Sequence, residues 1–274
     1  MTTSTSPRAT ADGSVVVTGA AGGIGAAVVD RLVSDGLHVI AVDLAAPGET
    51  MATADAEDGT ATTESDAEDG TATTESDAED GPADVAVERV TWVLGDLTTV
   101  SVRDDVVAAT SGRRLVGLVN VAGITRDARL ANMDDDMVAA VLAVNAQAPL
   151  DLSLALADRI VDGGAIVNIS SRSHLGNFGQ VNYSASKGAI VGTTIAMSRS
   201  LAPRIRVNAI APGIVATAMT AAMPTEVLAR ITAKVPLDRA GEPSDIAAEV
   251  AHLLSEDAAY VTGQVVYVCG GRSR

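Results

Sequence analysis

Apolar segments of two kinds alternate along almost the whole chain. Short runs rich in Val and Ile, typical of strands buried on both faces, are separated by segments in which apolar residues recur with the helical period. The strand-like runs lie at 14–19, 38–43, 89–96, 115–123, 165–171, 205–213 and 263–271, and the helical segments at 23–36, 134–160, 182–202 and 243–255. This alternation predicts an α/β fold, a single doubly wound domain with a parallel seven-stranded sheet and helices on both faces. Ligands bind such sheets outside the carboxyl ends of the strands.

One segment interrupts the alternation. Residues 55–65, DAEDGTATTES, recur letter for letter at 66–76, and a third copy begins directly after them. The repeat has no aromatic and no large aliphatic residue, so it cannot bury enough surface to offset its ordering entropy. We therefore expect a flexible N-terminus at 1–12 and a domain over 13–274, interrupted by a disordered acidic insert at about 48–84. A cation or partner site in the repeat is the alternative, although DAEDG lacks the full ligand pattern of a calcium loop.

The formal net charge of −16 comes mostly from this insert, because 11 of the 35 acidic residues lie between Asp55 and Asp80. The remaining 24 acids and 19 bases give an ordinary acidic domain, and nucleic-acid binding, which needs a basic face, is not expected. No segment resembles a signal peptide or an uninterrupted membrane span, so we expect no membrane partner. The single Cys269 and the three scattered His residues favour a reducing cytoplasm and predict no metal site.

A glycine-rich turn, TGAAGGIG, joins the first strand to the first helix at 18–25. Glycines there allow a tight turn and a close approach to a diphosphate, and the helix directs its free N–H groups at the anion. Asp43 ends the second strand, where a carboxylate can accept both ribose hydroxyls and repel a 2′-phosphate. No Arg or Lys lies in 18–25 or 44–50 to hold such a phosphate, so NAD is favoured over NADP. A turn-capping Asp is the alternative for Asp43, and Asp96 after the third strand is a candidate for the adenine edge.

The stretch NYSASKGA contains Tyr183 and Lys187, in a chain with only three Tyr and two Lys. At positions i and i+4 near the start of a helix the two side chains share a face. A phenol has a reference pKa of about 10, and a nearby ammonium lowers it. Tyr183 could then donate a proton to a carbonyl as hydride arrives, or accept one in reverse. A surface helix with an incidental Tyr/Lys pair is the alternative, and the surrounding order of strands argues against it.

With these motifs the chain resembles the short-chain dehydrogenase/reductase family over about 14–271 without the insert. It matches T-G-x3-G-x-G at Thr18, Gly19, Gly23 and Gly25, and Y-x3-K at Tyr183 and Lys187. The resemblance implies a Rossmann-type fold, an NAD(P)-dependent oxidoreductase acting on CH–OH and C=O groups, and a homotetramer. The implied cofactor-binding residues are Thr18, Gly19, Gly23, Ile24, Gly25, Asp43, Asp96, Leu97, Asn120, Ala122, Gly123, Tyr183, Lys187, Pro212, Gly213, Val215 and Thr217.

The same resemblance implies the rest of the catalytic set. A Ser at the end of the fifth strand should polarise the substrate carbonyl, and NISS offers Ser170 and Ser171, of which Ser171 is the better match. Asn145 resembles the family's helix Asn, which holds a water beside the Lys. Lys187 should also hold the nicotinamide ribose hydroxyls.

Three segments, 123–133, 235–247 and 260–271, look most like the 3-oxoacyl-thioester (acyl-carrier-protein) reductase branch of the family. The resemblance therefore predicts a 3-oxoacyl-thioester reductase, with a general NAD-dependent secondary-alcohol dehydrogenase or carbonyl reductase of broad specificity as the alternative. Segment 217–235 is either a mobile lid over substrate or an ordinary packing helix. A hypothesis of another class is a nucleotide-responsive binding module, with the acidic repeat as the contact for a partner.

Overall fold

The computed structural model describes residues 12–47, 89–221 and 223–273. The insert predicted at about 48–84 lies outside the described residues, as does the predicted N-terminal segment apart from Asp12. The central sheet consists of β1 (Ser14–Thr18), β2 (His38–Asp43), β3 (Val90–Leu94), β4 (Leu115–Asn120), β5 (Ala165–Ile169), β6 (Arg206–Pro212) and β7 (Val265–Val268).

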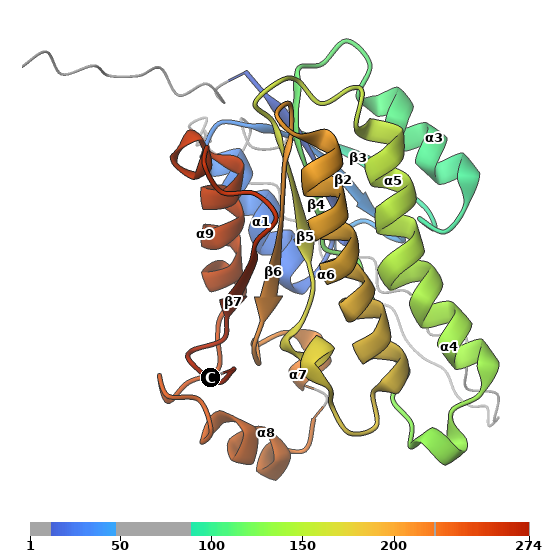
Figure 1. The fold of residues 1–274 in the computed structure, drawn as a ribbon, viewed down its shortest axis with the longest axis vertical. Coiled ribbons are helices and arrows are strands. Elements are labelled where there is room, and N and C mark those ends of the chain that lie inside the picture. The colour runs from blue at the N-terminus through green and yellow to red at the C-terminus, as the bar shows by residue number, and fades with distance from the viewer. Residues whose placement is uncertain (1–11, 48–88, 222, 274) are drawn as a thin grey trace, which may run out of the picture.

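All neighbouring strands of this sheet run parallel, in the order β3-β2-β1-β4-β5-β6-β7. The predicted doubly wound seven-stranded sheet is therefore confirmed (Figure 1). The order of strands reverses between β1 and β4, which is the place where doubly wound sheets bind their ligands.

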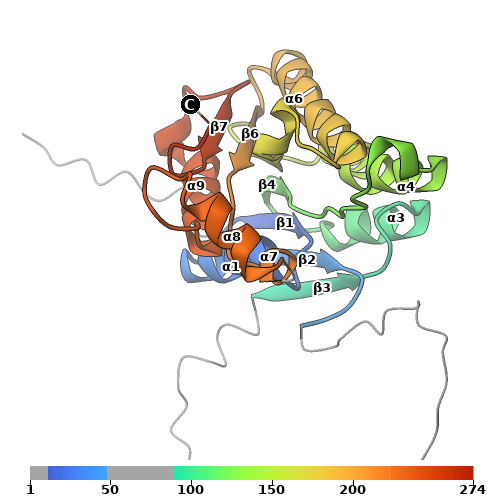
Figure 2. The same cartoon turned by 90° about the horizontal axis from the view of Figure 1, so that it is seen from below.

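Helices cover both faces of the sheet (Figure 1). The α-helices of the described residues are α1 (Gly23–Ser34), α3 (Val100–Ala109), α4 (Asp135–Leu142), α5 (Ala148–Leu156), α6 (Val181–Leu201), α7 (Ala218–Ala221), α8 (Thr225–Thr232) and α9 (Pro243–Leu254). Helices α1 and α9 pack on one face, and α3, α5 and α6 on the other. The short helices α7 and α8 lie over the carboxyl edge of the sheet, which faces the viewer in Figure 2.

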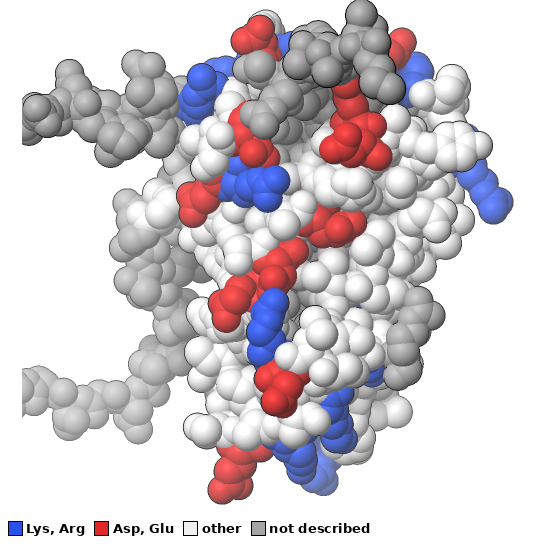
Figure 3. Space-filling view, turned by 90° about the vertical axis from the view of Figure 1, so that its left-hand side faces the viewer, with Lys and Arg blue, Asp and Glu red and all other residues white. Residues whose placement is uncertain are grey.

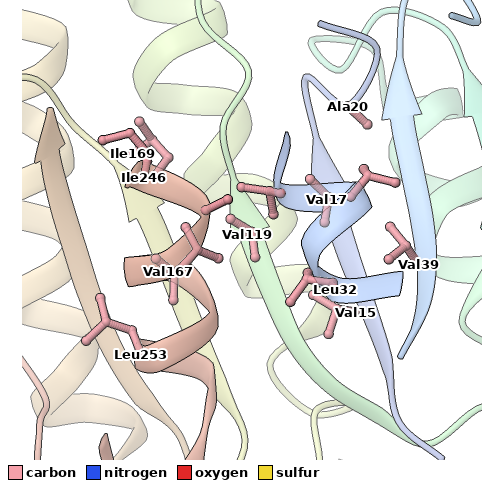
Figure 4. Packing of buried hydrophobic residues seen from close by; sticks show 14 of the residues in the cluster. Val15, Val17, Ala20, Leu32, Val39, Val119, Val167, Ile169, Ile246 and Leu253 are labelled. Atoms are coloured by element: carbon pink, nitrogen blue, oxygen red, sulfur yellow. The ribbon is translucent and has the colours of Figure 1, made fainter. Parts of the chain in front are cut away.

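The strands are apolar on both sides because each side carries its own core. Val15 and Val17 contribute to the cluster under α1 and α9, whereas Val16 between them contributes to the cluster under α3, α5 and α6. Figure 4 shows the first cluster, where Leu32 and Leu253 meet the sheet. A fully buried aliphatic side chain stabilises a fold by roughly 1.5–3 kcal/mol, which explains the continuous Val/Ile runs of the sequence.

Two details of the helices differ from the prediction. The helix expected at 134–160 ends at Leu156 and is interrupted by a π-helical turn at Ala143–Gln147. Helix α3 was not predicted, because its apolar face is narrow and only Val102 and Val106 are buried. Strand β2 ends at Asp43 as predicted, and the other strands end one to three residues before the apolar runs do, since several runs continue into the loops of the site.

The combined helix from Asp135 to Leu156 is long and apolar enough to cross a membrane, by length and composition only. Its residues Val141, Leu152 and Leu156 are buried within the fold. On the face of the molecule shown in Figure 3, acidic and basic side chains are interspersed and do not gather by sign.

Candidate active site

The glycine-rich turn between β1 and α1 forms an open cradle. Gly19 and Gly23 have φ values of +66° and +52°, in the left-handed region that favours glycine. No side chain caps the N-terminus of α1, and a Cβ at Gly22 would meet nothing within 4 Å. A free helix N-terminus beside an uncrowded turn fits the diphosphate of a dinucleotide.

Asp43 lies beside this cradle at the end of β2. Its Oδ2 accepts a hydrogen bond from Ala21 N at 2.8 Å, and its Oδ1 accepts one from Leu44 N at 2.7 Å. The carboxylate is therefore fixed to the turn that is predicted to hold the diphosphate. Each oxygen keeps a further lone pair with which it can accept a ribose hydroxyl.

Thr18 joins the ends of β1 and β4 at the point where the strand order reverses. Its Oγ1 accepts hydrogen bonds from Val121 N and Ala122 N, both at 3.1 Å. Gly19 lies so close to Ala122 that a Cβ would come within 2.8 Å of its backbone. The predicted residues of these two loops are thus brought together.

The side chain of Asn120 is used inside the fold. Its Nδ2 donates to Asn168 Oδ1 at 2.8 Å and to Ser153 Oγ at 3.1 Å, and Asn168 Nδ2 donates to Thr194 Oγ1 at 2.9 Å. This buried network ties β4 and β5 to α5 and α6. Both donors of Asn120 are committed to this network, whereas its buried Oδ1 has no hydrogen-bond partner among the described residues, and the cofactor contact at this position stays a prediction.

The loop after β6 reaches back to the cradle. Gly213 N donates to Val268 O at 2.9 Å, and Val215 forms a single β-bridge with Gly241. The side chain of Thr217 lies over Gly23, 3.3 Å from the position of a Cβ there. Asp96 differs from these residues, because its Oδ1 accepts from the N–H and hydroxyl of Thr98 and so caps the turn that precedes α3.

The two candidate serines after β5 have different environments. Ser170 is buried, and its Oγ donates to Lys187 O at 2.9 Å, which fastens α6 to the sheet. The Ser171 hydroxyl lies close enough to the Tyr183 phenol to offset part of the rise in its pKa that burial causes. Of the two hydroxyls, the one of Ser171 is therefore placed to share a ligand with the phenol.

Lys187 is buried next to the ring of Tyr183. Its Nζ donates to Ile169 O at 2.9 Å and lies 5.7 Å from the centroid of the Tyr183 ring. The backbone of Gly123 packs so closely that a Cβ there would lie 3.3 Å from both Lys187 Nζ and Asn145 Oδ1. These four residues come from three separate segments and form one cluster at the carboxyl edge of the sheet.

Asn145 enters this cluster from the π-helical turn. Its Oδ1 accepts from Ile124 N at 2.8 Å, and its Nδ2 donates to Ile124 O at 2.9 Å and to Ser186 Oγ at 3.1 Å. Both amide hydrogens are used, whereas Oδ1 accepts one hydrogen bond and keeps a second lone pair, so only this oxygen of the side chain is left to contact a further group. Single π turns inside helices often occur at functional sites.

One electrostatic expectation was wrong in direction. The pKa of Tyr183 is raised, not lowered, because burial of the phenol outweighs the hydrogen bond from Ser171, and the charge of Asp127 raises it further. A raised pKa keeps Tyr183 protonated at neutral pH, which suits it to donate a proton. Burial also lowers the pKa of Lys187 to about 8.

We expect ketone reduction to slow at alkaline pH as Lys187 loses its proton. A phenolate formed by proton donation is stabilised by the ammonium, and this charge is present below a pH of about 8 and lost above it. The value of kcat/KM should be flat at lower pH and fall about tenfold per pH unit above this value. In Lys187→Arg the guanidinium stays charged, so the fall in kcat/KM above a pH of about 8 should disappear. A wild-type profile without a bend on the alkaline side would contradict this assignment.

Some residues at the site were missed by the sequence analysis. His174 and Tyr267 form a hydrogen bond beside Ser171, and Gln180 Nε2 donates to Asp127 Oδ2 at 2.7 Å near Tyr183. No local pattern identifies them, because they come from loops and from the last strand. Only the position of 172–180 directly after the fifth strand could have drawn attention to His174.

Helix α8, within the predicted lid segment 217–235, has no buried residue. This disfavours an ordinary packing helix for that part of the segment, and its role as a lid stays a prediction.

Comparison with known proteins places these features in context. A family model described as "Enoyl-(Acyl carrier protein) reductase" matches residues 75–273. A (3R)-3-hydroxyacyl-CoA dehydrogenase of Mus musculus is 37% identical over 270 residues, covering 93% of this chain and 94% of the relative. A 3-oxoacyl-[acyl-carrier-protein] reductase of Thermotoga maritima is 40% identical over 162 residues, covering 58% of this chain and 66% of the relative. The crystal structure of a protein described as short-chain dehydrogenase/reductase, glucose/ribitol dehydrogenase, from Brucella melitensis matches with a TM-score of 0.78 at 26% identity, covering 97% of this chain and 99% of that one.

Proposed function

Since the chain belongs to the short-chain dehydrogenase/reductase family and is an oxidoreductase for hydroxyl and keto groups, we propose that it interconverts 3-oxoacyl and 3-hydroxyacyl thioesters with NAD(H). The observation that carries this proposal is the cluster of the Ser171 hydroxyl, the Tyr183 phenol and the buried Lys187 ammonium, in which Ser171 offsets part of the rise that burial causes in the pKa of Tyr183 and Lys187 Nζ lies 5.7 Å from its ring centroid. A phenol that is protonated at neutral pH, beside a hydroxyl and an ammonium, is suited to donate a proton to a carbonyl oxygen.

Each residue of the cluster has a separate task in reduction. The Ser171 hydroxyl donates a hydrogen bond to the substrate carbonyl oxygen, which polarises the C=O bond. Tyr183 transfers its proton to that oxygen as the carbon gains hydride, and Lys187 stabilises the resulting phenolate. The main-chain oxygen of Ile169 accepts a hydrogen bond from the Lys187 ammonium and holds it in place. The nicotinamide, when bound, supplies the hydride for reduction or accepts it for oxidation.

NAD is the proposed cofactor because of the carboxylate that lies beside the glycine-rich turn, where the ribose next to the adenine is expected. Asp43 presents a carboxylate fixed to the glycine-rich turn, and a 2′-phosphate there would meet a like charge. No Arg or Lys in 18–25 or 44–50 is present to bind a 2′-phosphate and offset this repulsion. The family uses a nicotinamide cofactor, and the choice between NAD and NADP rests on this carboxylate.

The thioester substrate is proposed from two observations. The mouse and Thermotoga relatives are named for 3-hydroxyacyl-CoA and 3-oxoacyl-[acyl-carrier-protein], which share the same reacting group. The loops after β4 and β5 expose large apolar side chains at the carboxyl edge, with Leu130 71% and Phe178 86% exposed. Hydrogen bonds join these loops, among them Ala128 N to Gly179 O at 3.0 Å. Such a surface suits an acyl chain.

A broad secondary-alcohol dehydrogenase is the second candidate, favoured by the close structural match to a protein described as a glucose/ribitol dehydrogenase. A nucleotide-responsive binding module is the third, and the complete Ser171, Tyr183 and Lys187 set argues against it.

We also propose a homotetramer with contacts through α4, α5 and α6, supported by the exposed Leu154 on α5 and Ile195 on α6. The single Cys269 supports a cytoplasmic location. Sedimentation velocity of the purified protein tests the tetramer.

The function is tested by measuring cofactor oxidation with acetoacetyl-CoA beside a simple aryl ketone, each with NADH and with NADPH. We expect thioester turnover well above ketone turnover, and NADH turnover well above NADPH turnover. The reverse order of substrates would make the chain a secondary-alcohol dehydrogenase. Equal rates with NADH and NADPH would contradict the role given to Asp43. No turnover with either substrate would contradict the proposed function.

A further inference from the structure

A hydrogen-bond chain runs from the last strand of the sheet to the serine of the site. Tyr267 Oη, on β7, lies 2.8 Å from His174 Nε2, and His174 Nδ1 lies 2.6 Å from Ser171 O. The two rings also pack against each other, with centroids 5.6 Å apart. Tyr267 and Ser171 are 96 positions apart in the sequence, and the imidazole is the bridge between them.

The chemistry of the three groups determines which atom donates in each of these hydrogen bonds. Ser171 O is a carbonyl oxygen and only accepts, so His174 Nδ1 must carry the proton. In a neutral imidazole Nε2 is then an acceptor, and the Tyr267 hydroxyl donates to it. The arrangement therefore selects one tautomer of His174 and one orientation of its ring.

Ser171 is held at its main chain and at its side chain. Its carbonyl oxygen accepts from His174 N at 3.1 Å as well as from Nδ1, and its Oγ accepts from Ser173 N at 3.1 Å. These contacts lie in the short 3-10 helix η3 (Arg172–Leu175) that begins directly after Ser171. Without the imidazole contact, the first peptide of this turn would be anchored less tightly, and the Ser171 hydroxyl with it.

We propose that His174 and Tyr267 are positioning residues that orient the Ser171 hydroxyl toward Tyr183 and the substrate carbonyl. Tyr267 is held in place by the sheet, because this residue of β7 is paired with Ala211 of β6. Its hydroxyl holds the imidazole of His174, which in turn holds the carbonyl group of Ser171. This inference rests on the proposed function, in which the Ser171 hydroxyl polarises the carbonyl.

Two amide substitutions at His174 separate positioning from general packing. Asn can place an N–H close to the position of Nδ1, whereas the longer Gln carries its N–H toward the position of Nε2. His174→Gln should lower kcat about tenfold with an unchanged KM for NADH, and His174→Asn should retain most of the activity. Tyr267→Phe, which keeps the ring and removes only the hydroxyl, should show a smaller loss and serves as the test if His174→Gln does not fold.

A double substitution tests whether the effect passes through the Ser171 hydroxyl. In a Ser171→Ala background, His174→Gln should change kcat by less than about twofold, because no hydroxyl remains to be oriented. A full loss in that background, or equal losses in His174→Asn and His174→Gln, would overturn the proposal.

A second measurement does not depend on the substrate. The protein contains three Tyr, so labelling with [13Cζ]tyrosine gives three resonances, and Tyr183→Phe identifies the one from Tyr183. His174→Gln should shift the Tyr183 resonance, because the Ser171 hydroxyl acts on that phenol and opposes the rise in its pKa that burial causes. His174→Asn should shift only the Tyr267 resonance. If Tyr183 does not respond to His174→Gln, the inference fails even if the enzyme reduces thioesters. If it responds in a protein that reduces neither substrate, the inference holds and the proposed function fails.

Discussion

Replacing Tyr183 with Phe should lower kcat for thioester reduction about a thousandfold, because a positioned general acid contributes roughly 10²- to 10⁴-fold. Phe keeps the ring that packs near Lys187 and removes only the hydroxyl. The affinity for NADH, measured by fluorescence titration, should stay within about twofold, since no change is made to the glycine-rich turn or to Asp43. The loss should therefore lie in kcat.

Tyr260→Phe is the matched control for this substitution. Tyr260 is fully exposed, so removing its hydroxyl should leave kcat unchanged. If Tyr183→Phe retained more than about a tenth of the wild-type kcat, proton donation would have to come from another group, and the mechanism would be wrong.

The second large effect is expected at Gly25, in the first turn of α1. A Cβ built there would lie 1.8 Å from Gly19 O, and the obstructing atom belongs to the backbone of the turn. Gly25→Ala should therefore lower the free energy of unfolding by about 3 kcal/mol, the upper part of the usual range for overpacking, and weaken NADH binding. Urea unfolding without cofactor measures the first effect.

Gly22→Ala provides the comparison within the same turn. Its Cβ would meet nothing within 4 Å, and its φ of −148° is extended backbone that any residue adopts. The free energy of unfolding should change by no more than about 1 kcal/mol, because Ala caps a helix less well than Gly but also restricts the unfolded chain. Equal losses in the two variants would show that the turn relaxes around a Cβ at Gly25.

Much of the fold and the centre of the site could be predicted from the sequence. The continuous Val/Ile runs required a sheet buried on both faces, and the observed strand order agrees with this. Tyr183, Lys187, Thr18 and the glycines could be recognised because each belongs to a short motif with a fixed position relative to a strand or helix.

The sign of the Tyr183 shift and the role of His174 could not be predicted in this way. The pKa of Tyr183 depends on how much water its phenol loses, which is set by the packing of distant segments. His174 acquires a role only because β7 brings Tyr267 to it. The interruption of the helix at Asn145 was also missed.

The pairing of Asn145 with Ile124 limits which substitutions the site can tolerate. The side-chain amide both accepts from and donates to the main chain of one residue, as an added residue of a β-strand would. Asp has the same shape and loses the donor, Leu loses both partners, and Gln has the right groups on a longer stem. Almost every substitution of Asn145 should therefore lose at least one of these hydrogen bonds, although Asn145 need not touch substrate. A side chain that stands in for backbone should be as intolerant of replacement as a catalytic group, so intolerance alone does not identify the residues that react.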